Sequence, residues 1–491
     1  YNFGSDSSFA ANKTAQGNGG AGEDFYYTPP SGYKALCTDN LPTPLIALPG
    51  EYFNTIIYTG DGSSPSPTRV VGFQPDFVWT KLSDTAESHG LFDSVRGVQK
   101  QLRSNTNGAE TSNAQTLLSF ESTGFTSGSD TVINQNTKPY VAWNWKADGG
   151  AAVSKTYTVT TSASKFYLGG IQQPTLELRE GSTYTFDTSD ATVSGHTFKF
   201  ATAADAAGST EYTTGVTETG TPGSAGAKTV IVVAASAPAL FYYCSNHSSM
   251  GGAANTPATG GSSNFDGTIA STVSANTTSG FSIVKYEGSG SATTVGHGLS
   301  VAPNMVIVKQ YETAQGDGWP VYTSIVGNTK ALHLENTDNP VTSINFWNST
   351  TPTASVFSVF QSTETNESGK DYIAYCFHSV EGYSKVSSYT GNNNADGTFV
   401  YTGFRPAYIM FRRYDTDESW GLYDDKRPGY NVTPNRIYAD SNSAQVTSST
   451  SQIDMLSNGF KARSTGGVVN AAGTYLYIAF AQSPFKTSNA R

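Results

Sequence analysis

The sequence predicts an all-β protein made of tandem β-sandwich modules, with a different sandwich inserted between the first and second modules. Only 14% of the 491 residues are charged, against about 25% in an average globular domain. Ser, Thr, Asn and 50 glycines must therefore supply much of the surface and the turns. Short segments such as 156–160 and 305–309 alternate with the period of strands. A pattern of residues also recurs three times along the chain, and no long segment has the periodicity of an amphipathic helix.

Charge, hydropathy and cysteine usage exclude several classes of protein. The 29 Lys and Arg against 39 Asp and Glu give a net charge of −10, so we expect no nucleic-acid-binding face. No apolar stretch reaches the length of a membrane span, and we expect none. Cys37, Cys244 and Cys376 are too few and too far apart for a disulfide framework. Because neither Gly-x-Ser-x-Gly nor His-Glu-x-x-His is present, we predict that the protein is not an enzyme.

The repeated modules are predicted to span residues 51–150, 280–381 and 382–491. Each contains a strand with a Pro near its start, where a missing N–H costs least, and each ends on an aromatic strand. We expect the repeated aromatic residues to form the sandwich cores, because aromatic side chains dominate such cores. The closing aromatic strands are residues 140–145, 372–377 and 475–480.

The remaining segments divide by composition. Residues 151–252 have their own strand pattern and form the predicted insert. Residues 253–279 are rich in Gly, Ser, Thr and Ala, which is typical of a loosely structured linker. Residues 1–50 are too loop-like to form a domain alone, and because the chain starts at Tyr1 we expect a processed or incomplete product.

One constellation in the insert carries chemistry. Cys244, His247 and Met250 form a Cys-x2-His-x2-Met string after an aromatic strand, and His196 lies on an earlier segment. A thiolate, two imidazoles and a weak axial thioether are the ligands of a blue-copper site. These four residues are therefore candidate copper ligands. The alternative is that they are structural, with the thiol acting as a small buried side chain.

The insert also resembles the cupredoxin family, over residues 156–252. Residues 174–186 are similar to the family's early strand, Gly turn and following strand, and the four candidate ligands match its two histidines, thiolate and axial methionine. The resemblance implies bound copper and a cupredoxin-like Greek-key sandwich. Together with the repeat, the expected fold is all-β, with tandem β-sandwich modules and an inserted cupredoxin-like Greek-key sandwich. The Ser- and Gly-rich ligand loop and the long polar stretch 201–226 depart from the electron-transfer members of the family.

Other candidate residues are predicted to be structural. They are Cys376 and His378 in a closing strand, Cys37 in a core, His297 in a turn, and His89 and His333 in polar surroundings. The carboxylates of residues 415–419 offer hard oxygen ligands for Ca²⁺, but a solvated acidic loop is the favoured interpretation.

The repeated module resembles an uncharacterised β-rich module of virion proteins from marine tailed bacteriophages. Residues 294–303, 346–350 and 372–377 carry this resemblance, and residues 27–37 resemble the end of a SPRY-like, lectin-like sandwich in the same kind of protein. The resemblance implies a structural virion protein with a virion or extracellular location. It would be a subunit of a tail or capsid fibre that mediates attachment to the host surface.

From this interpretation we expect a stiff, extended rod of modules. We also expect a homotrimer, contacts with other virion proteins, and a host surface glycan or protein as partner. Two alternatives stay open: a copper-binding, cupredoxin-type redox protein, and a surface protein that binds or degrades glycans.

Overall fold

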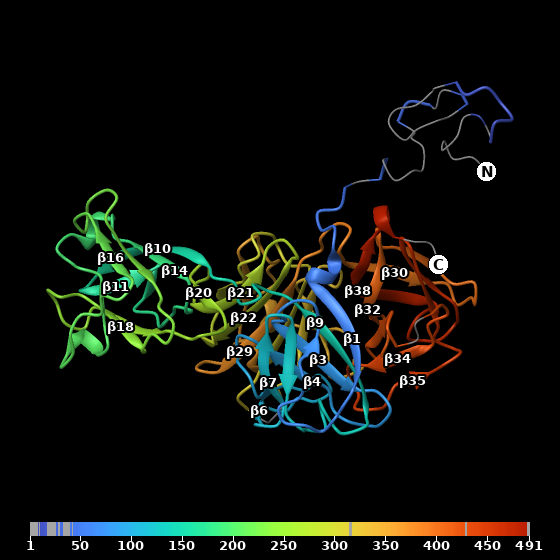
Figure 1. Cartoon of the computed structure of the whole chain (residues 1–491), viewed down its shortest axis with the longest axis horizontal. Coiled ribbons are helices and arrows are strands. Elements are labelled where there is room, and N and C mark those ends of the chain that lie inside the picture. The colour runs from blue at the N-terminus through green and yellow to red at the C-terminus, as the bar shows by residue number, and fades with distance from the viewer. Residues whose placement is uncertain are drawn as a thin grey trace.

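The protein is nearly all β, which confirms the predicted fold class (Figure 1). No helix among the described residues is long and apolar enough to cross a membrane. The computed structural model describes residues 8, 10–16, 26–27, 30–32, 40–41, 43–313, 317–427 and 430–488. Cys37 and most of the lectin-like string 27–37 lie outside these described residues.

The first module follows the short 3-10 helix η2 (Pro49–Glu51) and consists mainly of two antiparallel sheets. The larger sheet has the strand order β1-β9-β3-β4, the smaller one has the order β2-β8-β7, and β5 pairs with β6. The strands are β1 (Phe53–Thr59), β2 (Arg69–Val70), β3 (Phe77–Leu82), β4 (Gly90–Asp93), β5 (Lys100–Gln101), β6 (Thr111–Ser112), β7 (Leu117–Glu121), β8 (Gly124–Ser127) and β9 (Pro139–Trp145).

The second module has a sheet of order β20-β21-β22-β29-β24-β25-β26-β27 and a pair β23-β28. It also contains two four-residue helices, α1 (Ile344–Trp347) and α2 (Thr363–Asn366). The strands are β20 (Ser262–Asn264), β21 (Ser271–Asn276), β22 (Phe281–Glu287), β23 (Thr293–Gly296), β24 (Met305–Gln310), β25 (Pro320–Thr323), β26 (Lys330–His333), β27 (Val341–Thr342), β28 (Val356–Val359) and β29 (Asp371–Phe377).

The third module has the sheets β30-β38-β32-β33-β34-β35 and β31-β37-β36, and ends in the 3-10 helix η5 (Phe485–Thr487). The strands are β30 (Ser384–Gly391), β31 (Phe399–Tyr401), β32 (Phe404–Arg413), β33 (Gly421–Asp424), β34 (Asn435–Tyr438), β35 (Val446–Thr447), β36 (Ile453–Leu456), β37 (Gly459–Ala462) and β38 (Gly473–Pro484).

The three modules share one strand order, as the repeat predicts. In each, the closing strand lies between the opening strand and the strand that follows, giving β1-β9-β3-β4, β22-β29-β24-β25 and β30-β38-β32-β33. The registers agree as well, since Trp145 of β9 pairs with Phe77 and Phe377 of β29 pairs with Met305. Equal positions in the repeat therefore occupy equal positions in the sheets.

The segment expected to be a loose linker is ordered instead. Strands β20 and β21 lie within residues 253–279 and extend the sheet of the second module beyond β22. Ser262, Ser271, Val273 and Ser274 are buried there. Small side chains suit this close packing, so the composition that suggested flexibility belongs to two strands at a covered edge.

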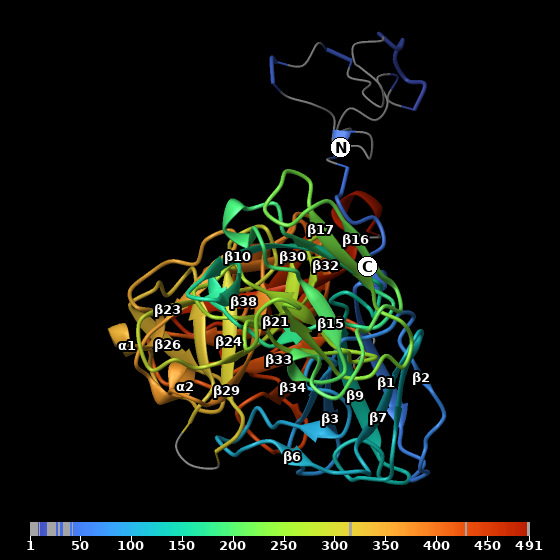
Figure 2. The same cartoon turned by 90° about the vertical axis from the view of Figure 1, so that its left-hand side faces the viewer.

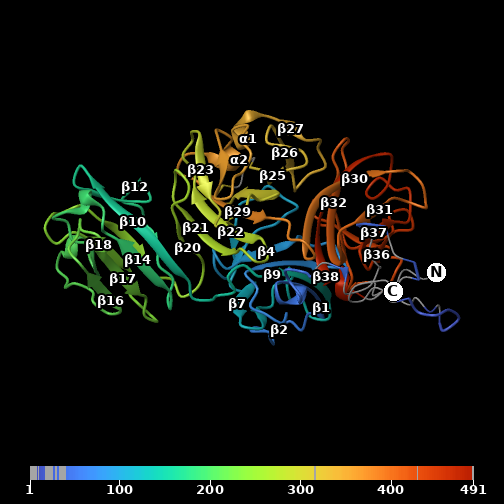
Figure 3. The ribbon, with the colours of Figure 1, turned by 90° about the horizontal axis from the view of Figure 1, so that it is seen from above.

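The modules form a closed ring rather than the extended rod expected from their tandem order (Figure 3). Trp319 of the second module donates its indole N–H to the carbonyl oxygen of Arg103 in the first module, at 3.1 Å. Trp420 of the third module donates in the same way to the carbonyl oxygen of His333 in the second, at 2.7 Å. The two junctions thus use equal positions of the repeat in the same direction.

The third junction closes the ring through a histidine. His89 precedes Gly90 as Trp420 precedes Gly421, so it occupies the equivalent position in the first module. Its Nε2 lies 2.9 Å from the carbonyl oxygen of Tyr438 in the third module. His89 is 0% exposed, and the polar surroundings predicted for it are wrong because a neighbouring module covers it.

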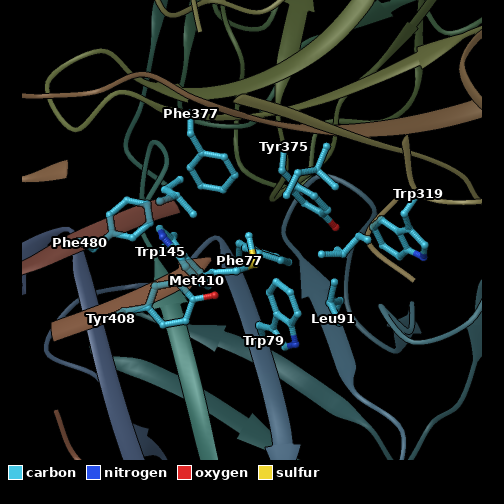
Figure 4. Close-up of a pocket in the computed structure, with 13 residues that line it drawn as sticks. Phe77, Trp79, Leu91, Trp145, Trp319, Tyr375, Phe377, Tyr408, Met410 and Phe480 are labelled. Carbon is cyan, nitrogen blue, oxygen red and sulfur yellow. The ribbon is translucent and has the colours of Figure 1, made fainter. Parts of the chain in front are cut away.

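One hydrophobic core joins the three modules at the centre of the ring (Figure 4). The ring centroids of Phe77 and Tyr375 lie 4.3 Å apart, and those of Phe53 and Phe480 lie 5.0 Å apart. The aromatic residues surround an apolar void of only about 10 Å³, no more than one water molecule needs. Burying each such side chain contributes about 1.5–3 kcal/mol, so the repeated aromatics are core residues, as predicted, but of a core shared between modules.

Two buried ion pairs mark the module junctions. Arg96 pairs with Asp93 at 2.6 Å, and Tyr375 of the second module donates its hydroxyl to Asp93 at 2.9 Å. The third module repeats the arrangement with Arg427 and Asp424, where the Nε–Oδ2 distance is 2.6 Å. At the remaining junction the equivalent of these aspartates is a threonine, so one junction of the ring has no charge at this position.

The insert is a two-sheet sandwich with its own hydrophobic core, and Figure 2 views the molecule from its side. The sheets have the orders β12-β11-β10-β14-β17-β16 and β13-β19-β18-β15, with parallel pairs β10–β14 and β13–β19. The elements are β10 (Ser154–Ser162), β11 (Lys165–Leu168), β12 (Ile171–Gln172), β13 (Leu176–Glu177), β14 (Thr183–Asp187), η3 (Ala191–Val193), β15 (Lys199–Ala201), η4 (Ala204–Ala206), β16 (Val216–Thr219), β17 (Lys228–Val232), β18 (Leu240–Tyr243) and β19 (Gly252–Asn255).

The insert stands beside the second module, next to β20 and β21 (Figures 1 and 3). The buried Arg179 of the insert makes an ion pair of 2.7 Å with Asp148 at the end of the first module. It also donates to the carbonyl oxygen of Gly260 at 2.9 Å. Hydrogen bonds from the insert to β20 add to this boundary, and Phe265, which follows β20, packs against the insert core. The buried residues of that core nevertheless all belong to the insert.

Candidate metal centre

Strand pairing brings three of the predicted ligands together. β15 and β18 are antiparallel, with Lys199 opposite Tyr243. The residue that follows β18, Cys244, therefore lies beside the segment that precedes β15, which contains His196. His247 follows three residues after Cys244, on the loop that leads to β19.

The ligand atoms of these three residues converge. His196 Nδ1 lies 3.1 Å from His247 Nδ1, and Cys244 Sγ lies 3.6 Å from His247 Nδ1 and 4.0 Å from His196 Nδ1. All the ligand atoms lie within 4.8 Å of one another. Among the described residues, this is the one group of three or more His, Cys, Asp or Glu side chains that could hold a metal ion.

The three side chains differ in exposure. Cys244 is 3% exposed, His196 is half-buried and His247 is exposed. Burial, with a smaller contribution from the neighbouring His247, lowers the pKa of His196. Its imidazole is therefore neutral at neutral pH, which leaves a nitrogen lone pair for a metal.

The ligand loop is fixed by contacts from outside it. The backbone N–H of Ser249 donates to Asp205 Oδ2 at 2.7 Å. Gln173 donates to the carbonyl oxygens of Ser249 and Gly251, at 3.0 and 2.6 Å, and Lys165 also donates to Ser249. These contacts hold the loop in one shape, which reduces the rearrangement needed to bind an ion.

Thr197 connects the two ligand segments, and its role has no signature in the sequence. Its hydroxyl oxygen accepts the N–H of Ser245 at 2.8 Å and lies 3.9 Å from Cys244 Sγ. It thus ties the residue after His196 to the residue after Cys244. A single threonine belongs to no metal-ligand motif, so spacing arguments could not identify it.

The fourth predicted ligand, Met250, is fully buried in the hydrophobic core that contains Cys244. Its carbonyl oxygen accepts the N–H of Phe166 at 2.9 Å. The rim of the site is polar, since Ser245, Asn246 and Ser249 are exposed. This polar rim differs from the apolar surface on which a partner protein would dock.

Most of the other candidate residues have structural surroundings. Cys376 is buried on β29, where burial raises the pKa of its thiol to about 12. His297 is buried in a turn, with Nδ1 accepting the N–H of Leu299 at 3.2 Å. His333 Nε2 lies 3.0 Å from Glu364, and hydrogen bonding to that carboxylate raises the pKa of His333 against the opposing effect of burial.

The acidic loop does not gather its carboxylates around one point. Asp415 pairs with Arg413 at 2.5 Å, and Asp417 accepts the N–H of Asn339 at 3.1 Å. Glu418 accepts the N–H of Ser419. The carboxylates are thus engaged separately, which favours the interpretation as an acidic loop.

Comparison with known proteins separates the ligand-bearing part of the insert from most of the chain. The sequence model of a protein family described as a domain of unknown function (DUF7483) matches residues 48–169 and 250–484. The unmatched residues 170–249 include His196, Cys244 and His247. No curated protein and no solved structure matched the chain.

Proposed function

Since the chain belongs to the DUF7483 family, a domain of unknown function, we propose its role from its own residues: the insert binds a copper ion. The observation that carries this proposal is the convergence of Cys244 Sγ with the Nδ1 atoms of His196 and His247. A thiolate with two imidazoles also suits Zn²⁺. Met250, which is buried in the same hydrophobic core as Cys244, favours copper, because a weak thioether ligand is typical of copper sites.

The residues of the chain define what such a site can do. Cys244 and Met250 lie on the buried side, and His247 is exposed to solvent. Copper supplies one-electron redox chemistry when bound. The chain orients the ligands through Thr197 and leaves one imidazole at a polar rim, which suits exchange with small solutes better than docking of an apolar protein face.

Copper titration of the purified protein tests this proposal. We expect one equivalent of Cu²⁺ to produce an intense visible absorption, and Cys244→Ser to abolish it. Cys376→Ala removes a cysteine of the ring and serves as the matched control, which should keep the absorption. A protein that stays colourless, or one whose metal uptake does not depend on Cys244, would contradict the proposal.

We also propose that the three-module ring is a structural virion component, a tail or capsid appendage subunit that mediates host attachment. The resemblance of residues 294–303 and 372–377 to virion modules supports this role. So does the shared core of the ring, which makes a rigid support without needing disulfides. Gold-labelled antibodies against the chain should decorate an appendage on purified phage particles, and unlabelled particles would contradict the role.

A further inference from the structure

The third module exposes two aromatic side chains that the core does not use. Phe399 is 45% exposed and Tyr401 is 53% exposed, whereas Val400 between them is 7% exposed. Alternation along β31 therefore places both side chains on the outer face of the strand, with their Cα atoms about 7 Å apart along the extended chain. β31 lies at the edge of its sheet.

This pair is specific to one module. Val400 pairs with Phe460 as Arg69 of the first module pairs with Phe125. The position of Tyr401 is thus held by Val70 in the first module. The corresponding residue of the second module is Gly296, by the same pairing of β23 with β28. The repeat itself does not require an aromatic residue here.

Tyr401 borders a groove of about 500 Å³ between the third module and the segment that enters the ring. Lys385 lies over the Tyr401 ring, 5.4 Å from its centroid, and donates to the Tyr401 carbonyl oxygen at 3.0 Å. This contact places a positive charge beside the exposed ring. The polar groups that line the groove include Lys385, Lys486, Glu381 and Ser384.

We propose that this groove, with Phe399 and Tyr401, binds an acidic polysaccharide. The negative faces of aromatic rings attract the C–H faces of sugars, and two rings along a strand can receive neighbouring sugars of one chain. Lys385 and Lys486 supply positive charge for carboxylates of the polysaccharide, while Glu381 and Ser384 can bond its hydroxyls. The inference rests on the attachment role proposed above, and it names the ligand and the residues of that role.

Calorimetric titration with alginate, a polyuronate, and with neutral dextran tests the site. We expect alginate to bind and dextran to bind at least tenfold more weakly, and Tyr401→Ala or Phe399→Ala to weaken alginate binding roughly tenfold. Val70→Ala, at the equivalent position of the first module, is the matched control and should bind alginate normally. The unfolding midpoint should stay unchanged in all three variants because each of these side chains is at least 45% exposed.

Several results would overturn the inference: no alginate binding, equal binding of dextran, or normal binding by Tyr401→Ala. Adsorption of fluorescently labelled protein to host cells separates this site from the attachment role. Equal adsorption of Tyr401→Ala and the natural protein leaves the attachment role intact and removes the site. Alginate binding through Tyr401 without adsorption to cells supports the site and counts against the attachment role.

Discussion

The ring and the insert bury their aromatic residues in different ways. In the ring, one core joins strands from all three modules, so that Phe77 of the first packs on Tyr375 of the second. In the insert, the stacked pair Phe186 and Phe198 belongs to a core whose buried residues all come from the insert, with Phe265 of the second module packed against it. The difference teaches that a scaffold with one shared core can carry a domain with a core of its own, whose ligand residues lie outside the packing of the scaffold.

The largest expected effect comes from the shared core. Trp145 lies within 5.7 Å of Phe53, Phe77 and Tyr408, measured between ring centroids. We expect Trp145→Ala to lower the free energy of unfolding of the ring by about 3–5 kcal/mol. Urea unfolding followed by tryptophan fluorescence measures this. A copper affinity that fell by the same free energy would show that the two cores are not independent.

A second effect distinguishes the junctions of the ring. Asp93→Asn removes one of the two carboxylates that balance the buried Arg96, the other being Glu110 at 2.8 Å, and we expect a loss of about 2 kcal/mol. Thr323→Ala changes the equivalent position at the uncharged junction, where the expected loss is about 1 kcal/mol. Equal losses in urea unfolding would show that the buried ion pairs do not distinguish the junctions.

The sequence predicts the strands and the repeated modules, but it does not predict that the three modules close into a ring. Alternation and the repeat gave the strands, because each depends on local pattern. Ring closure depends on contacts between distant segments, such as Trp319 with Arg103, that carry no spacing signal. His89 illustrates the limit, since its equivalence to Trp319 and Trp420 emerges only from the sheet register.

The candidate metal site could also be predicted only in part from the sequence. Cys244, His247 and His196 could be found because their types and spacing match a ligand set. Thr197 and Asp205 could not, because a hydroxyl or a carboxylate that orients a loop belongs to no motif. The supporting contacts of a site are therefore the part that needs three-dimensional information.

Asp76, which lies in the first module near Asp148, should make the stability of the ring depend on pH. Burial, with a further contribution from the charge of Asp148, raises the pKa of Asp76 to about 7. The folded state then holds this proton over a range where the unfolded state, with a pKa near 3.9, does not. The contribution of Asp76 to stability therefore falls as pH rises from about 4 to 7 and is constant above that range.

Asp76→Asn isolates this contribution. The difference in unfolding free energy between the natural protein and the variant should change across this pH range and level off above it. Guanidinium unfolding at pH 4 to 8 measures the difference. A difference that is the same at every pH would rule out the raised pKa.

The smallest expected effect concerns the positioning of the ligands. Thr197→Ala keeps all four candidate ligands and removes the contact of 2.8 Å with Ser245. We expect copper affinity to fall about fivefold, the equivalent of about 1 kcal/mol. Competition with a copper chelator measures the affinity, and Thr197→Ser, which retains the hydroxyl, should restore it.

The most direct test of the account uses the distribution of tryptophans. All six lie in ring modules, so their fluorescence reports unfolding of the ring and not of the insert. They are Trp79, Trp143, Trp145, Trp319, Trp347 and Trp420. Urea unfolding of the copper-loaded protein should give one midpoint for tryptophan fluorescence, unchanged when copper is removed, and a different midpoint for the copper absorption. Coincident transitions, or a fluorescence midpoint that moves with copper, would contradict an independent copper domain on a closed scaffold.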